Sequence, residues 1–181
     1  MTPPTRIRRR TPRLSRRLAP AVLAVAALAT GLQPGVAAAG PTAVQSRVDA
    51  YLATHPGGSQ ISQTDIAYSG GVFIVSVARP AGIAPLAGPD CPGGWFCFYD
   101  GTNYTYPRGR LSDCGWQDLG HWGWRNRTES VHYNLNYGST TFLDETGPTD
   151  TKLFVVDTAR RTMPDVSPHR NRADYVYRAC S

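Results

Sequence analysis

The chain has 181 residues, with 19 Lys plus Arg against 13 Asp plus Glu and a formal net charge of +6. Seven arginines precede residue 18, so the rest of the chain carries 19 − 7 = 12 basic residues against the same 13 acids, a formal charge of about −1. A nucleic-acid partner requires a basic face on the folded domain, and this charge balance argues against one.

Residues 1–39 have the features of a secretory signal peptide. The seven arginines are followed by the apolar run LAPAVLAVAALATGL and then by the small-residue stretch VAAAG, in the order of an n-region, an h-region and an A-x-A cleavage site. The apolar run is too short for a stable membrane anchor. We therefore expect cleavage after Ala39, a secreted product, and no membrane contact after cleavage.

Residues 40–78 are predicted to form a small α+β segment. The stretch AVQSRVDAYLATH favours a helix that ends at PGG, and two strand-like runs, QISQTDIAYS and GVFIVSVA, follow it. Residues 79–89 are rich in Pro and Gly and predict a linker. We expect a flexible attachment, and the pattern leaves open whether residues 40–78 are retained or act as a removable pro-segment.

Residues 90–181 are predicted to form an all-β domain. Short aromatic and β-branched runs, broken by Asp, Gly, Asn and Pro, are typical of an antiparallel sandwich. The stretch RNRTES at 125–130 returns as RNRADY at 170–175, and each copy directly precedes a predicted strand. Each copy also follows an aromatic-Asp turn, FYDGT or FLDET. The repeat indicates two duplicated units, each a Greek key, packed face to face.

Four cysteines in an exported chain predict two disulfides. Three pairings are possible. The turn-forming stretch CPGGWFC lets its ends meet, which favours Cys91 with Cys97 and leaves Cys114 with Cys180. The cysteine spacings match no zinc-finger pattern.

The stretches CPGGWFCFYDGTNY, LSDCGWQDLGHWGW and RNRTESV resemble the secreted bacterial metalloproteinase-inhibitor family. The resemblance covers residues 90–181 and implies a βγ-crystallin-like sandwich of two Greek keys. It also implies a secreted, non-catalytic, monomeric inhibitor whose partner is an extracellular protease of the thermolysin-like metalloprotease class. The alternatives are a carbohydrate- or cell-surface-binding module, or a crystallin-like toxin or stress protein of the cell envelope.

Three groups of residues are candidates for contact with a partner. The short disulfide encloses Gly94, Trp95 and Phe96, which we interpret as the inhibitory loop because the bridge restricts its shape. The stretch 140–143 is a second loop candidate. Sugar stacking suits three further aromatic residues, Trp116, Trp122 and Trp124, although packing in a small β core is the competing interpretation.

No cofactor is expected. By the resemblance, the two repeats occupy the place of the crystallin calcium motif, where Glu129 and Asp174 are weak calcium candidates because calcium takes oxygen ligands. Arg125 and Arg170 would repel a cation there. The competing interpretation is that the two acids pair with these arginines and lock the turn.

Catalysis is not expected either. None of the four histidines stands in an H-E-x-x-H motif, and the chain has neither a G-x-S-x-G motif nor a Gly-rich phosphate loop. All four thiols have expected disulfide partners. The sequence therefore predicts a protein that is not an enzyme.

Overall fold

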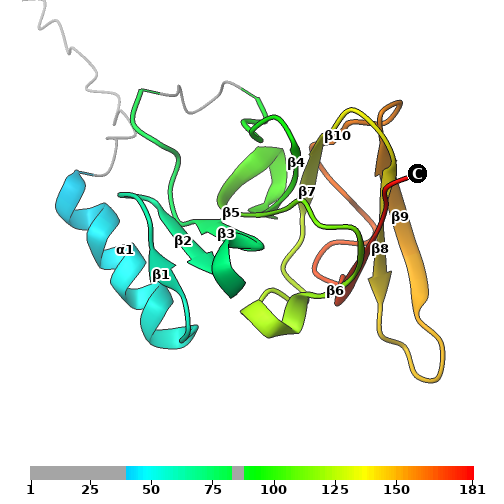
Figure 1. Ribbon diagram of the computed structural model, residues 1–181, viewed down its shortest axis with the longest axis horizontal. Helices are drawn as coiled ribbons and strands as arrows, with labels where there is room; N and C mark the ends of the chain where they lie inside the picture. Colours follow the sequence, from blue (N-terminus) through cyan, green and yellow to red (C-terminus); the bar gives the residue numbers. More distant parts are fainter. Residues whose placement is uncertain (1–39, 83–87) are drawn as a thin grey trace, which may run out of the picture. The chain divides into compact units, whose positions relative to one another are not determined.

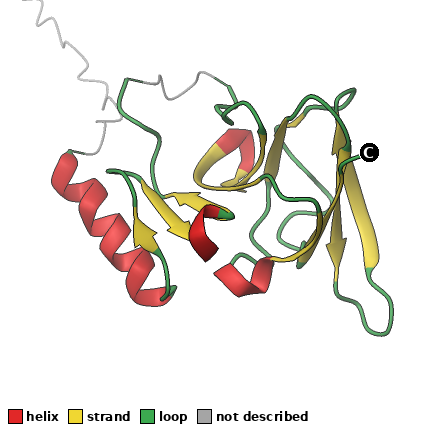
Figure 2. Ribbon diagram, in the orientation of Figure 1, coloured by secondary structure: helices red, strands yellow, loops and turns green. Residues whose placement is uncertain are grey.

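The computed structural model describes residues 40–82 and 88–181. The expected signal peptide and part of the expected linker lie outside these residues. The described residues form one α-helix and antiparallel strands in two sheets (Figures 1 and 2), with a few single turns of 3-10 helix between strands. The prediction of an all-β sandwich is confirmed.

The helix α1 spans Pro41–Thr54, close to the predicted stretch. It starts with a proline at a position where no backbone N–H is needed, and it ends where the His55 N–H donates to the Tyr51 carbonyl at 2.8 Å, directly before Pro56. Val48 and Tyr51 face the main core and are buried there.

The strands that follow α1 extend the first sheet. They are β1 (Ser59–Gln60), β2 (Asp65–Tyr68) and β3 (Phe73–Ser76). All four residues of β3 are buried, and β3 pairs with β5 (Thr105–Leu111) from Phe73 opposite Leu111 to Ser76 opposite Arg108. The expected flexible attachment of this segment is therefore wrong, because main-chain hydrogen bonds and a shared core hold it. The boundaries drawn at residues 78 and 89 stay a prediction.

The two sheets repeat one strand order. The remaining strands of the first sheet are β4 (Trp95–Gly101), β7 (Ser130–Asn134) and β10 (Thr162–Met163). Those of the second are β6 (Gly115–Asp118), β8 (Ser139–Asp144), β9 (Thr151–Asp157) and β11 (Tyr175–Ala179). The first sheet contains the order β5-β4-β7-β10 and the second the order β9-β8-β11-β6. The first unit consists of β4 to β7 and the second of β8 to β11. The third strand of the first unit, β6, lies in the second sheet, and the third strand of the second unit, β10, lies in the first. The closer comparison with βγ-crystallins stays a prediction.

Aromatic side chains fill the space between the two sheets. Phe98 of β4 meets Phe142 of β8 edge to face with ring centroids 6.1 Å apart, and Phe142 stacks on Phe154 of β9 at 4.6 Å. Trp124 packs edge to face on Phe98 at 5.4 Å. Such pairs add to the free energy gained by apolar burial. Neither sheet face is buried without the other, so the two units stabilise each other.

Candidate functional site

The two copies of the repeat contact each other reciprocally. Asn126 Nδ2 donates to Asp174 Oδ1 at 3.1 Å, and Asn171 Nδ2 donates to Glu129 Oε1 at 2.8 Å. Both asparagines have positive φ, 57° and 54°, a region that Asn tolerates better than most residues. The acid of each copy is therefore held by the asparagine of the other.

The arginines of the repeat bind other acids. Arg125 Nε lies 2.9 Å from Asp118 Oδ1, and Arg170 Nε donates to Asp165 Oδ1 at 2.7 Å. The hydrogen bond from Arg170 lowers the pKa of Asp165 to about 2. The interpretation that Arg125 and Arg170 pair with Glu129 and Asp174 is therefore wrong.

The third residue of each copy ties the repeat to the aromatic-Asp turn of its own unit. Arg127 Nη2 lies 2.7 Å from Asp100, and Arg172 Nη2 lies 2.7 Å from Asp144. Each Arg-Asn-Arg stretch thus forms ion pairs within its own unit through its arginines and a hydrogen bond across to the other unit through its asparagine. These contacts explain why the whole motif occurs twice.

The part of the chain that the structure describes holds no group of three or more His, Cys, Asp or Glu arranged for a metal ion. Glu129 and Asp174 lie on opposite sides of the reciprocal contact, and each has an amide as its hydrogen-bond partner. The expectation about calcium stays a prediction.

Both disulfides have the predicted pairing. Cys91 is bonded to Cys97 with a Cα–Cα distance of 5.6 Å, and Cys114 to Cys180 with a distance of 5.8 Å. The described residues include no free cysteine. Two disulfides are typical of proteins from an oxidising compartment outside the cytoplasm.

The short disulfide closes an exposed turn at Gly93 and Gly94. Gly94 has φ 84°. This backbone conformation is strained for a residue with a side chain, so the position requires glycine. Its N–H donates to the Asn134 carbonyl at 2.9 Å, and Asn134 Nδ2 donates back to the Cys91 carbonyl at 2.8 Å. The turn is therefore held by a covalent bond and by two hydrogen bonds to β7.

Only part of the expected inhibitory loop reaches the surface. Gly94 is exposed, whereas Trp95 is half-buried with the Arg110 guanidinium 5.1 Å from its ring centroid. Phe96 is fully buried and packs edge to face on Phe142. Its assignment to a contact surface is wrong, because β4 alternates and directs Phe96 into the core.

The prediction that residues 140–143 form a second exposed loop is also wrong. These residues belong to β8, in the interior of the second sheet between β9 and β11. Thr140, Phe142 and Leu143 are buried. An exposed loop follows instead at residues 145–150, where all six residues are exposed and the chain turns from β8 into β9 (Figure 1).

The loop at residues 145–150 is tethered by side chains that sequence reasoning did not connect to it. The Glu145 N–H donates to Asp174 Oδ2 at 2.9 Å, and the Glu145 carboxylate lies 2.5 Å from Arg125 Nη1. Thr146 Oγ1 and Thr151 Oγ1 are 2.6 Å apart across the base of the loop. The repeat residues Arg125 and Asp174 thus position a loop far from them in the sequence.

A buried ionic cluster holds the residue before the short disulfide. The Asp90 carboxylate accepts hydrogen bonds from the hydroxyls of Tyr99 at 3.1 Å and Tyr106 at 2.5 Å. It also forms ion pairs with Arg108 at 3.2 Å and Arg79 at 3.4 Å. Burial raises the pKa of both tyrosines well above the usual range, so both keep the protons that they donate. An acid next to a disulfide was the only sequence signal for this cluster.

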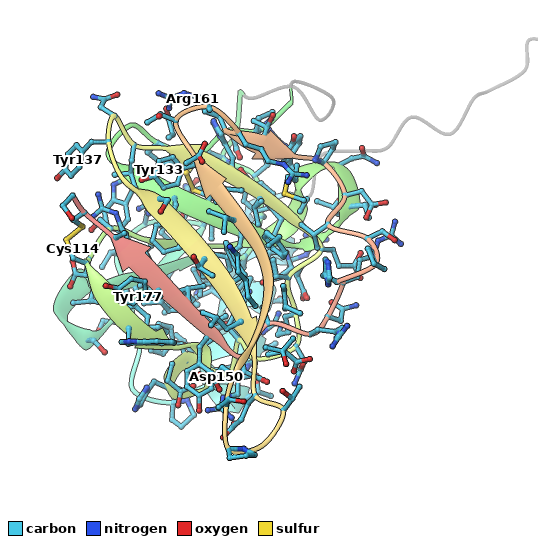
Figure 3. The ribbon with its side chains drawn as sticks, turned by 90° about the vertical axis from the view of Figure 1, so that its right-hand side faces the viewer. Cys114, Tyr133, Tyr137, Asp150, Arg161 and Tyr177 are labelled. Atoms are coloured by element: carbon cyan, nitrogen blue, oxygen red, sulfur yellow. A yellow bond between two sulfur atoms is a disulfide. The ribbon has the colours of Figure 1, made fainter. Side chains whose placement is uncertain are left out.

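Of the three tryptophans considered as candidates for sugar stacking, one is exposed. Trp124 is fully buried, and Trp122 is 7 % exposed and stacks on Phe73 with ring centroids 4.5 Å apart. Their assignment to sugar stacking is therefore wrong, and packing in the core accounts for both. Trp116 of β6 is 59 % exposed and lies beside Tyr177 of β11, which Figure 3 labels.

The fold and its loops define a disulfide-bonded β-sandwich that presents tethered, exposed loops. The model of peptidase inhibitor family I36 matches residues 84–150, a span that includes the short disulfide, its turn and the loop at residues 145–150. The resemblance to a peptidase-inhibitor family is thereby confirmed. No curated protein and no solved structure matches the chain.

Among the described residues, no helix combines the length and the apolar character needed to span a membrane.

Proposed function

We propose that the protein is a secreted, non-catalytic inhibitor of extracellular metalloproteases of the thermolysin-like class, and that it acts as a monomer. The observation that carries the proposal is the match of residues 84–150 to peptidase inhibitor family I36. The two disulfides support a place outside the cytoplasm.

The turn at Gly93 and Gly94 is the better of the two tethered loops for entry into a protease cleft. The disulfide and a hydrogen bond from Asn134 hold its shape. The ionic cluster adds to this by fixing Asp90, the residue directly before the first cysteine. Preorganisation lowers the cost of ordering on binding, which is about 0.5 to 1.5 kcal/mol per immobilised side chain. Trp95 is the bulky apolar side chain that this turn offers.

The proposal is tested with the full chain against thermolysin-like, serine and cysteine proteases. We expect micromolar protein to slow the metalloproteases and to leave the others unaffected. Trp95→Ala should weaken inhibition about tenfold, equivalent to ~1.4 kcal/mol, while the exposed His121→Ala should have no effect. Failure to slow any metalloprotease contradicts the function. Pro148 lies in the other tethered loop, at residues 145–150. If Pro148→Gly abolishes inhibition and Trp95→Ala leaves it unchanged, the choice of loop is contradicted.

We further propose that this inhibitor carries no metal of its own, because the amides of Asn126 and Asn171 already use the acids of the repeat. Calcium should therefore leave the melting temperature unchanged, and Glu129→Ala should behave alike with calcium and with chelator. Differential scanning fluorimetry measures this. A rise in melting temperature with calcium, abolished by Glu129→Ala, is the contradicting result.

A further inference from the structure

The outer face of the second sheet carries an exposed aromatic pair. Trp116 of β6 lies directly opposite Tyr177 of β11, with ring centroids 5.2 Å apart. Their exposed fractions are 59 % and 39 %. Figure 3 shows this face, with β11, β8 and β9 side by side and Tyr177 in front. Isolated exposed aromatics are ordinary, but these two are in contact, with their ring planes tilted by 52°, and together form one exposed aromatic surface, which we call the platform.

An open hollow of about 460 Å³ adjoins the platform. Its lining comes from Trp116, Asp118, His121, Asp150 and Tyr175. Asp150 belongs to the loop at residues 145–150 and lies below the strands in Figure 3. The volume falls in the range of sites for small ligands, which combine an apolar lining with a few polar groups.

Arg125 fixes the geometry on one side of the hollow. Its guanidinium lies 4.6 Å from the ring centroid of Tyr175 and donates to the Tyr175 hydroxyl at 2.5 Å. Burial opposes ionisation of Asp118, but the hydrogen bonds from Arg125 and from the Gly120 N–H, together with the charge of Arg125, outweigh it and lower the pKa of this carboxyl. Asp118 therefore stays an ionised acceptor, and its orientation is set by Arg125 and by the Gly120 N–H at 2.7 Å.

We propose that this face, with the platform of Trp116 and Tyr177 and the adjoining hollow, binds a glycan of neutral sugars. A sugar ring presents a face of C–H groups, which an aromatic face attracts through its negative quadrupole. Its hydroxyls donate to carboxylates such as Asp118 and Asp150, and they both donate to and accept from an imidazole such as His121.

Other ligand classes fit this face less well. Two carboxylates in the hollow disfavour an anion. A cation on the Tyr175 ring would displace Arg125, which already occupies that position. Protein interfaces are depleted of charged residues at their centre, whereas here the carboxylates line the hollow itself.

The test measures retention of the full chain on insoluble chitin, cellulose and starch, with soluble oligosaccharides as competitors. Trp116→Ala and Tyr177→Ala should each weaken retention about tenfold, which corresponds to ~1.4 kcal/mol. Trp116→Phe should keep most of it, because a ring remains for stacking. Tyr137→Ala is the matched control, since Tyr137 is 58 % exposed and does not line the hollow. Melting temperatures establish that each variant is folded.

Three results overturn the proposal: retention on none of the polymers, equal losses in Tyr137→Ala and Trp116→Ala, or competition by a lysine-rich peptide in place of oligosaccharides. The glycan site lies on the second sheet, whereas Trp95 belongs to the first. Trp116→Ala should therefore leave protease inhibition unchanged. Retention and inhibition can thus fail separately.

Discussion

Replacing Asp90 with alanine is expected to lower the free energy of unfolding by about 3 to 5 kcal/mol, as is typical when a buried ion pair loses one partner. Arg108 has a side chain only 3 % exposed, and the substitution leaves its charge without the carboxylate at 3.2 Å. The hydroxyls of Tyr99 and Tyr106 lose their acceptor at the same time. A buried donor without an acceptor keeps its full desolvation cost.

Urea unfolding of the Asp90→Ala protein should show a lower midpoint at an unchanged slope. Asp165→Ala is the control, because its ion pair with Arg170 is exposed and should contribute little. A midpoint shift no larger than that of the control would mean that the cluster does not stabilise the fold. The double change Asp90→Leu and Arg108→Met should recover part of the loss, since it removes the buried charge of Arg108 together with its partner.

Loss of the Cys114–Cys180 bond should lower the free energy of unfolding by about 4 kcal/mol, nearly as much as Asp90→Ala. Loss of the Cys91–Cys97 bond should lower it by about 2 kcal/mol. The reason is chain entropy, because the two bonds close loops with sequence separations of 66 and 6 residues. The long bond also joins β6 to the end of β11, the two strands that carry the aromatic platform.

Two double variants measure these contributions, Cys114→Ala with Cys180→Ala and Cys91→Ala with Cys97→Ala. Chemical unfolding should rank the long bond above the short one. Inhibition should rank them in the opposite order, because only the short bond encloses the proposed inhibitory turn. A larger stability loss from the short bond would contradict the entropic argument. If the two double variants weakened inhibition equally, the turn would not be the inhibitory site.

The local features of this protein could be read from its sequence. The helix at Pro41–Thr54 follows from its pattern and its stop at PGG, and the strands follow from aromatic and β-branched runs. The disulfide pairing follows from a turn that brings Cys91 and Cys97 together. The repeat indicated a duplication, and the strand orders of the two sheets are equivalent. Each of these inferences depends on short stretches of sequence or on the comparison of two such stretches.

The tertiary structure decided which residues can reach a partner. Phe96, Trp122 and Trp124 resemble surface candidates by type, but packing against other aromatic side chains of the core buries them. Trp116, by contrast, is exposed. The pairing of β3 with β5 rests on main-chain groups that every residue carries, so no side-chain pattern names the partner strand. The acid of each repeat copy accepts a hydrogen bond from the asparagine of the other copy. These contacts form because the packing of the two units brings together groups more than 40 residues apart, such as Asn126 and Asp174.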